Sequence, residues 1–568
     1  MTLTRTPSST AVPHATPVSS SSSSTSGSHR RRKRTRHTGM FMVLGCGTMA
    51  LVMGDTMAGT LAVPLVASHR LGAGVALVDL QWIASAAAIT YAAALAAAGR
   101  LADAVGRRRV LLAGLLIFAL GGAAAAIAPD LVVLVAARAL QGAGAGAIVP
   151  ASLALLLTQL PATRRAAAIG AWSASSGLGG IPLHGAGGWL AELWNWRLLF
   201  APAAVAGLLL AVVAMMLPAD RGDRADRWRR VPDPIGTLML LGGLTALVLA
   251  LSKGQQWGWP SLLGLISMAF GMLLIALVRS CGHRAPAIDL TLWRRPRFLL
   301  AALIALMYGL VSLALLSTAP FLLRHWQLPL PLIGLALAPL SASVLTSSLL
   351  AGPLVRRRGV RPVIYIGVLV VVGAALWQLQ AGLRPEPQLA LWMAACLLMG
   401  VGLGMISTGA SAAATLTAGS DHYASAVGAS MTARQLGGAI GVAVGMLLLE
   451  HPPLRGPMPG NSAVFALIIG GVAVAGFAAL FLHPTAAPPA PATKAAGGSD
   501  APIGAPAAQR SAPAPATPGP VPASAASLSP IPVLAGQLIE AIDYVLASQS
   551  TSVRSPRNRI RQPAGRQP

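Results

Sequence analysis

Long apolar stretches recur along this chain and are separated by short polar loops. A helix needs roughly 20 apolar residues to cross a hydrocarbon layer about 30 Å thick. Fourteen stretches reach that length, and the shorter, alternating segments of membrane β-barrels are not seen. The pattern therefore predicts an all-α integral membrane protein. Its expected spans are 41–67, 80–98, 109–128, 131–157, 167–190, 197–217, 235–251, 260–278, 298–323, 331–352, 362–380, 389–416, 424–449 and 462–482.

The composition agrees with this pattern. Hydrophobic residues make up 55% and charged residues 10% of the 568 positions, so lipid must cover apolar surface that a soluble domain could not bury. The 61 glycines allow helix backbones to approach closely where no hydrophobic effect drives helices together. The cysteines Cys46, Cys281 and Cys396 are too widely spaced to indicate a disulfide framework or a zinc site.

The net charge of +26 would by itself favour a nucleic-acid partner. The basic residues, however, are concentrated in every second predicted loop. Twenty-six of them lie in loops on the side of the N-terminus. The opposite side has six, namely Arg70, Arg197, Lys253, Arg324, Arg384 and Arg455. Because basic loops favour the cytoplasm, we expect a plasma-membrane protein with both termini cytoplasmic and no nucleic-acid partner.

The two ends of the chain have the composition of unstructured tails. Residues 1–39 are rich in Ser and Thr and end in a basic cluster, Arg30 to Arg36, which could fix the topology or bind anionic lipid. Residues 483–568 are rich in Pro, Ala and Ser. Within them, 531–546 has the pattern of a short amphipathic helix that could lie on the membrane.

The loop between the second and third spans combines glycines, a carboxylate and arginines. Gly99 and Gly106 permit tight turns at helix ends. Asp103 can cap a helix or pair with an arginine, while Arg107 and Arg108 favour the cytoplasmic side. The loop resembles the Gly-x-Leu-Ala-Asp-x-x-Gly-Arg-Arg signature of the major facilitator superfamily. This resemblance implies a gating role for these five residues.

The same spacing returns between the tenth and eleventh spans, where Arg356 occupies the position of Asp103. The chain is therefore predicted to be an internal duplication. In the superfamily that it resembles, two parallel six-helix halves face each other across a central cavity. We expect the halves at 40–217 and 298–482, joined by a linker at 218–297 with two additional transmembrane helices.

The fourth span contains Arg138, and a charged residue inside a bilayer costs about 3 kcal/mol on insertion scales. Its side chain should contact a partner or water, or extend to the nearby outer surface. The segment is similar to the Arg-x-x-Gln-Gly-x-Gly-x-Ala motif of the superfamily, which implies a part for Arg138 in proton coupling. The other motif residues are expected to pack this helix against its neighbours. They are Gln141, Gly142, Gly144 and Gly146.

The first span contains Asp55, the clearest acidic residue well inside a predicted span. An intramembrane carboxylate indicates a functional site, although it could instead be the structural partner of an arginine. Asp55, Thr56 and Pro64 match parts of a pattern typical of fourteen-helix drug/proton antiporters, whereas Met57 and Thr60 depart from it. The resemblance implies proton coupling at Asp55.

The fifth span departs further from that family. Gly179, Gly187 and Gly188 match helix-packing glycines of its Gly-x-x-x-Gly-Pro-x-x-Gly-Gly segment, but Leu183 and His184 replace Gly-Pro. Histidine titrates near pH 6.5, so His184 could be an additional proton-coupling residue. The alternative is a residue that packs helices or contacts water.

The sequence has no phosphate-binding loop to accept ATP, so an ion gradient is the expected energy source. No cofactor is expected besides the proton gradient. The chain is predicted to be a monomeric secondary active transporter and not an enzyme. Asp55 would exchange protons under the influence of Arg138. The resemblance implies efflux of small lipophilic compounds, of the multidrug type, by alternating access.

Small and apolar residues should line the substrate cavity, and candidate contacts are Met57, Trp172, Met307, Tyr308 and Met405. Because acidic residues are nearly absent from the spans of the second half, lipophilic neutral or monocationic compounds fit better than dications. Three alternatives stay open. They are export of an endogenous metabolite or lipid, proton-coupled uptake, and a non-transporting sensor built on the same fold.

Overall fold

The computed structural model describes residues 24–67, 74–193, 196–217, 231–324, 326–328, 330–381, 388–450 and 459–482. The C-terminal tail at 483–568, with the candidate amphipathic segment at 531–546, lies outside these residues. So does most of the Ser-rich start of the chain.

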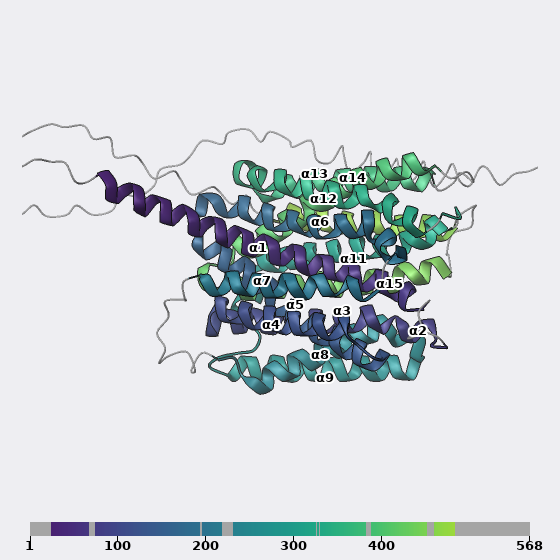
Figure 1. The fold of residues 1–568 in the computed structure, drawn as a ribbon, viewed down its shortest axis with the longest axis horizontal. Helices are drawn as coiled ribbons and strands as arrows, with labels where there is room; N and C mark the ends of the chain where they lie inside the picture. The colour runs from purple at the N-terminus through teal and green to yellow at the C-terminus, as the bar shows by residue number, and fades with distance from the viewer. Residues whose placement is uncertain are drawn as a thin grey trace, which may run out of the picture. The chain divides into compact units, whose positions relative to one another are not determined.

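Helices make up the regular structure of the described ranges (Figure 1). Their bounds are α1 Ser24–Ala67, α2 Leu77–Leu80, α3 Trp82–Val105, α4 Arg107–Ala126, α5 Leu131–Gln159, α6 Ala162–Leu193, η2 Trp196–Leu199, α7 Ala201–Met216, α8 Pro234–Trp257, α9 Trp259–Gly282, α10 Leu290–Trp293, α11 Pro296–Arg324, α12 Leu330–Arg358, α13 Val360–Ala381, α14 Leu389–Leu416, η4 Ser420–His422, α15 Tyr423–Glu450 and α16 Pro459–Leu480.

Thirteen of these helical segments are long and apolar enough to cross a membrane. Helix α6, with 32 residues, also has sufficient length. Each coincides with one of the predicted spans, so the all-α membrane fold is confirmed. The pattern works because the bilayer thickness fixes the length of every span and the hydrocarbon selects its composition.

Helix α1 extends beyond its predicted span. It begins at Ser24, so residues 24–39, which the composition assigned to an unstructured tail, are helical. Arginine and lysine are good helix formers, and the apolar helix that follows removes the cost of nucleation. The basic cluster, Arg30 to Arg36, is therefore the first part of a continuous helix of 44 residues.

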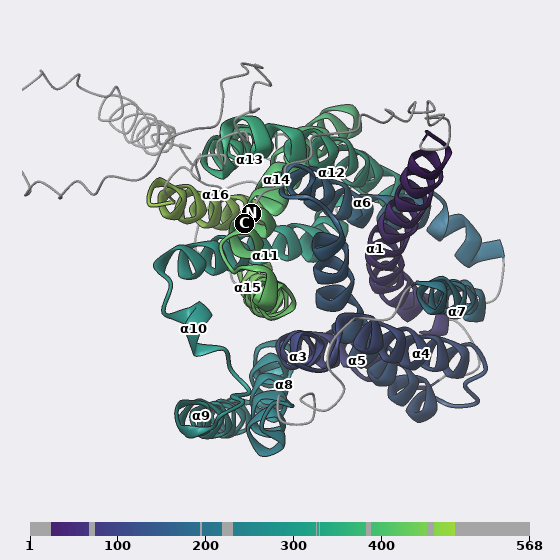
Figure 2. The same cartoon turned by 90° about the vertical axis from the view of Figure 1, so that its left-hand side faces the viewer.

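The long helices form two groups of six, separated in sequence by α8 and α9. The N-terminal group consists of α1 and α3 to α7, and the C-terminal group of α11 to α16. Figure 2, which looks along the helices, shows α1, α4, α5 and α7 on one side and α12, α13, α14 and α16 on the other. Helix α3 lies against α15, and α6 against α12, so these two pairs join the halves.

Paired glycines bring the halves together at two related crossings. A Cβ at Gly428 of α15 would lie 3.3 Å from the Cα of Gly99 in α3. A Cβ at Gly170 of α6 would lie 2.8 Å from the Cα of Gly352 in α12. Gly99 and Gly352 are the first residues of the two related loop segments, so the sequence duplication reappears as a duplicated contact between helices.

The two additional helices are attached to the edge of the N-terminal half (Figure 2). Lys253 of α8 is 2% exposed. Its Nζ donates to Oε1 of Gln81 at 3.4 Å and lies 5.3 Å from the ring centre of Trp82. The Trp82 ring stacks on Trp257 with centres 5.9 Å apart. These contacts fix α8 beside α3.

An ion pair fixes α8 against α9 at their other ends. Asp233 caps α8 by accepting from the backbone N–H groups of Ile235 and Gly236, and Arg279 Nε donates to its Oδ2 at 2.6 Å. The hydrogen bond from Arg279 lowers the pKa of Asp233 to about 2. The carboxylate is therefore charged, and the cap intact, over the physiological pH range.

Candidate functional site

A carboxylate and an arginine meet in the interior of the N-terminal half. Arg138 Nη1 in α5 donates to Oδ1 and Oδ2 of Asp55 in α1, at 2.9 and 2.8 Å. The side chains are 1% and 7% exposed respectively. The sequence identified each residue singly and left open that Arg138 extends to the outer surface. That alternative is wrong, because the guanidinium turns inward to Asp55.

Neighbouring groups complete the hydrogen bonding of this pair. Gln141 Nε2 donates to Asp55 Oδ1 at 2.8 Å, and Gln141 Oε1 accepts from Arg138 Nη1 at 2.6 Å. Arg138 Nε donates to the backbone carbonyl of Ile83 in α3 at 3.1 Å, and the ring of Phe200 lies 5.0 Å from its guanidinium. Because a buried ion pair is stable only with such additional bonds, the four polar groups act as one network.

Sequence reasoning gave one residue of this site a different role and missed another. Gln141 was assigned to helix packing, yet its amide bridges the carboxylate and the guanidinium. Gly59 leaves room for the arginine, because a Cβ there would lie 2.5 Å from Arg138 Nη2. The signal was present in the spacing, since Gly59 follows Asp55 by one helical turn and shares its face of α1.

The glycines after Arg138 lie at close helix contacts. A Cβ at Gly142 would lie 2.1 Å from the carbonyl oxygen of Ala87 in α3, and one at Gly146 would lie 2.6 Å from the Cβ of Ala94. On the other side, a Cβ at Gly144 would lie 2.6 Å from the backbone nitrogen of Phe118 in α4. Close backbone approach on two sides holds α5, and with it Arg138, in one position.

Helix α6 carries the other predicted packing glycines. A Cβ at Gly179 would lie 2.1 Å from the carbonyl oxygen of Ala50 in α1, one turn before Asp55. Gly187, Gly188 and His184 belong to α6 by their backbone. Their surroundings, and the side chain of His184, lie outside the described part of the chain, so the role of His184 stays a prediction.

The signature loop forms the second cluster, at the end of the helices that carries Arg107, Arg165 and Arg356, termed here the arginine-rich end. Arg107 Nη2 donates to Asp103 Oδ1 at 2.7 Å. Asp103 Oδ2 accepts from both the backbone N–H and the hydroxyl of Ser425, each at 2.7 Å. One carboxylate thus joins the N-terminal half to the first turn of α15 in the C-terminal half.

Other residues of the loop extend this connection. Arg107 donates to the backbone carbonyl of Ser420 and lies 5.9 Å from the ring centre of Tyr423. Arg165 of α6 donates to the Tyr423 hydroxyl at 2.9 Å. Arg108 instead contacts its own half, donating to the backbone carbonyl of Ala214 at 2.8 Å. Gly106 has a φ of 122°, which favours glycine, and lets the chain turn between α3 and α4.

A second carboxylate at the same end links the linker to both halves. Asp289 Oδ2 lies 3.1 Å from Nη1 of Arg100 in α3 and 2.6 Å from Nδ1 of His422 in η4. Burial would raise the pKa of Asp289, but the hydrogen bond from Thr291 and the charges of Arg100 and His422 outweigh it and lower that pKa. Sequence reasoning gave no sign of this group, because its members come from three separate segments.

Within the described residues, the duplicated loop has no equivalent connection through a carboxylate. Arg356, Arg357 and Arg358 are exposed, and Gly359 has a φ of 84°, as expected for a glycine that ends a helix. Arg356 stands where the first copy has Asp103, so this side has no carboxylate to accept hydrogen bonds from the other half. The halves are joined asymmetrically at the arginine-rich end.

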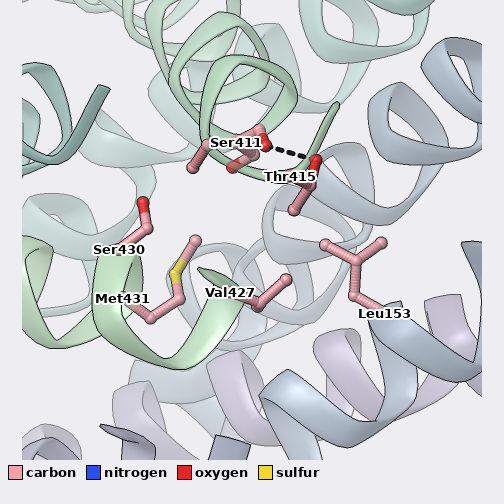
Figure 3. A pocket seen from close by; sticks show the side chains of 7 residues that line it. Leu153, Ser411, Thr415, Val427, Ser430 and Met431 are labelled. Carbon is pink, nitrogen blue, oxygen red and sulfur yellow. Dashed lines mark hydrogen bonds between the residues drawn. The ribbon is translucent and has the colours of Figure 1, made fainter. Parts of the chain in front are cut away.

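The predicted cavity residues occupy several environments. Trp172 of α6 is 1% exposed, and its indole Nε1 has no hydrogen-bond partner among the described residues. Tyr308 and Met405 are buried, whereas Met57 and Met307 are half-buried. A small void lies elsewhere between the halves (Figure 3). It is too small to hold a drug-sized compound in the described conformation.

Residues of α5, α14 and α15 line this void (Figure 3). Leu153 of α5 faces Ser411 and Thr415 of α14 and Val427, Ser430 and Met431 of α15. The hydroxyl of Ser430 has no partner among the described groups. The wall from the C-terminal half is therefore partly polar, while the opposite wall is apolar.

An arginine that sequence reasoning did not place in the site lies near this void. Arg434 of α15 donates from Nη2 to the hydroxyl of Tyr308 at 3.1 Å and from Nη1 to the hydroxyl of Ser407 at 3.4 Å. Its guanidinium also lies 4.2 Å from the centre of the Tyr308 ring. The signal was an arginine within a predicted span, the same one that identified Arg138.

Comparison with known proteins agrees with this architecture. The sequence profile of the Major Facilitator Superfamily matches residues 44–442 and 298–539. The multidrug resistance protein Stp of Mycobacterium tuberculosis is 31% identical over 64% of this chain and 68% of its own length. The puromycin resistance protein pur8 of Streptomyces alboniger is 32% identical over 72% of this chain and 81% of its own. The cephamycin export protein CmcT of Amycolatopsis lactamdurans is 30% identical over 71% and 83%.

Solved structures agree at the level of the fold. The proton:xylose symporter XylE, with sugar analogue bound, superposes with a TM-score of 0.58 and covers 80% of this chain and 97% of its own. A partially occluded, inward-open form of XylE from E. coli gives 0.54. Sequence identity is 16% in both cases, so the likeness concerns the arrangement of helices.

Proposed function

The chain belongs to the major facilitator superfamily, with relatives of the multidrug efflux type, and from this premise we propose that it is a proton-driven exporter of small lipophilic compounds. It is a multi-pass membrane transporter and not an enzyme. The observation that carries the proposal is the buried network of Asp55, Arg138 and Gln141, in which a carboxylate lies inside the helix bundle.

The network is suited to proton exchange because it has two ways of holding its arginine. With Asp55 charged, the carboxylate accepts both bonds from Arg138. When Asp55 takes up a proton, the carbonyl of Ile83 and the amide oxygen of Gln141 still accept from the guanidinium. Protonation would thus weaken the contact between α1 and α5, while the guanidinium keeps two neutral hydrogen-bond acceptors.

Transport by alternating access also needs an end that closes and opens. The bonds between Asp103 and Ser425, and between Arg165 and Tyr423, close the arginine-rich end across the two halves. When the end opens, each of these bonds can be replaced by a hydrogen bond to water, so the closure is reversible. We propose that the end faces the cytoplasm and that the described conformation is the one closed on that side.

The proton gradient supplies enough free energy for this work. One charge moving through 100 mV releases about 2.3 kcal/mol. That corresponds to nearly fiftyfold accumulation at one proton per substrate. We propose that the monomer needs no cofactor for this coupling.

The proposal is tested with the purified full chain in proteoliposomes under an imposed pH gradient. Puromycin and pyrene derivatives that are anionic, neutral and cationic serve as test compounds. Antiport is supported if a test compound moves in the direction opposite to proton flow and if this movement stops when a protonophore collapses the pH gradient. Movement in the direction of the protons would instead establish uptake, and Asp55-dependent binding without movement would establish the sensor.

The topology follows from the same proposal. Reporters fused after residues 39, 256 and 490 should indicate cytoplasm, exterior and cytoplasm, because α8 and α9 add one pair of spans between the halves. Alkaline phosphatase and green fluorescent protein fusions measure this. A cytoplasmic signal at 256 would show that the additional pair does not cross the membrane.

Replacing Arg138 by lysine should reduce proton-driven efflux about tenfold or more, although the charge is retained. The compact ammonium cannot contact Asp55, Gln141 and the Ile83 carbonyl at once, as the guanidinium does. Initial rates under a fixed pH gradient measure the loss. The matched control is Arg357→Lys, at an exposed arginine, and equal rates for both variants would contradict a coupling role for Arg138.

A further inference from the structure

Arg434 is a positive charge within a membrane span that has no negative partner in the described residues. Its two hydrogen bonds go to the neutral hydroxyls of Tyr308 and Ser407. The described ion pairs involve other residues, and Asp55 is already bonded to Arg138 and Gln141. Because charge inside a bilayer is costly and is usually compensated, Arg434 lacks a partner that a ligand could supply.

The position of Arg434 is between the two halves and is fixed by close packing. A Cβ at Gly437 of α15 would lie 1.9 Å from the carbonyl oxygen of Leu306 in α11, so the two backbones touch beside Arg434 and Tyr308. Ser407 belongs to α14. Tyr91, from α3 of the N-terminal half, is near enough to interact electrostatically with Arg434. The C-terminal half therefore holds the guanidinium, and the N-terminal half lies close to it.

The small void between the halves lies about one helical turn from this arginine, on the side of the arginine-rich end. Ser411 follows Ser407 by one turn of α14, and Ser430 precedes Arg434 by one turn of α15. These two helices are antiparallel, so both steps go in the same direction, and both serines line the void. The unpartnered hydroxyl of Ser430 and the guanidinium thus provide donors along one wall, opposite the apolar side chain of Leu153.

We infer that Arg434 is a specificity-determining residue that binds the acidic group of amphiphilic substrates, so that the exporter favours lipophilic carboxylates over neutral or cationic compounds of the same shape. The inference rests on the proposed export function and names its substrate class. A guanidinium can bind a carboxylate through two parallel hydrogen bonds, and the apolar wall accepts the lipophilic part. A cationic substrate would be repelled by Arg434. Asp55 could not offset this repulsion, because its carboxylate already bonds to Arg138.

The test compares three compounds with one ring system: 1-pyrenebutyrate, its methyl ester and 1-pyrenebutyl-trimethylammonium. Binding to the full chain in nanodiscs is measured by energy transfer from tryptophan to pyrene. We expect the carboxylate to bind about tenfold more tightly than the ester. Arg434→Gln should remove this difference by weakening carboxylate binding alone, and Arg434→Lys should retain part of it.

Two controls separate recognition from folding. Arg357→Gln makes the same charge change at an exposed arginine and should leave the preference unchanged. Thermal unfolding of each variant is followed in parallel. A wild-type protein that does not bind pyrenebutyrate more tightly than its ester, or an Arg434→Gln variant that weakens both equally, overturns the inference.

Binding and transport distinguish this inference from the proposed function. If the protein binds the carboxylate through Arg434 but moves no test compound under a pH gradient, the export function is rejected and recognition of an acidic ligand is supported. Proton-driven export without a carboxylate preference would reject the inference alone. Asp55→Asn should lose driven export and keep the carboxylate preference.

Discussion

Asp55→Asn should abolish proton-driven export, because an amide keeps the size of the carboxylate but cannot take up and release a proton. The same change removes the negative partner of a guanidinium that is 1% exposed. Breaking one side of a buried pair costs about 3–5 kcal/mol, so the variant should also unfold at a lower temperature. Initial rates of export under a fixed pH gradient, normalised to the amount of inserted protein, measure the first effect.

A second variant separates coupling from stability. Asp55→Asn combined with Arg138→Gln removes both charges, so it should recover much of the lost stability while export stays absent. Asp79→Asn, at an exposed carboxylate near the start of α3, is the control and should transport normally. If the double variant regained driven export, the pair would be a structural clamp and the proton would travel elsewhere.

The sequence was sufficient for the architecture because the membrane simplifies it. Every span must satisfy its own backbone hydrogen bonds and exceed a fixed length, so hydropathy identifies each helix without knowledge of its neighbours. The duplicated loop beginning at Gly99 and Gly352 identified the two halves, and these glycines lie at equivalent helix crossings. The start of α1 was the main difference, since helical propensity extends it through the basic cluster.

The site was predicted residue by residue but not as a network. Asp55 and Arg138 were recognisable because each is a costly charge inside an apolar stretch. That they bond to each other, and that Gln141 bridges them, depends on the rotation of α1 and α5 about their axes, which hydropathy does not determine. The role of Gly59 could not be predicted for the same reason, because this glycine leaves space for a side chain of another helix.

Contacts between the halves were the least predictable part. Asp103 and Ser425 are 322 positions apart, and Asp289 and His422 are 133 apart. Local sequence patterns carry no information about such pairs. Ser425 is an uncharged residue in the first turn of a helix, and nothing in its local sequence marks it as a contact. The motif containing Asp103 indicated a role at a loop, while its partner could be found only from the arrangement of the two halves.

Asp103→Asn should open the arginine-rich end and reduce export about tenfold or more. The change removes the charge that pairs with Arg107 and weakens the bonds from the backbone N–H and hydroxyl of Ser425. Hydrogen bonds to a charged group are worth about 1.5–3 kcal/mol each, and 1.4 kcal/mol changes a population ratio tenfold. The balance between conformations should therefore move toward the state that is open at this end.

The population shift can be measured separately from transport. Thr415 lines the void near the arginine-rich end, so Thr415→Cys, in a chain whose three native cysteines are replaced by serine, reports access from that side. Labelling by a membrane-impermeant maleimide in inside-out vesicles should become about tenfold faster when Asp103→Asn is added. Asp421→Asn changes an exposed carboxylate at the same end and should leave labelling unchanged. Because the duplicated loop has Arg356 in the equivalent position, Asp103 has no counterpart in the second loop that could take over its bonds across this end. Unaltered labelling together with lost export would assign Asp103 to a step other than closure, and unaltered values of both would exclude it from the cycle.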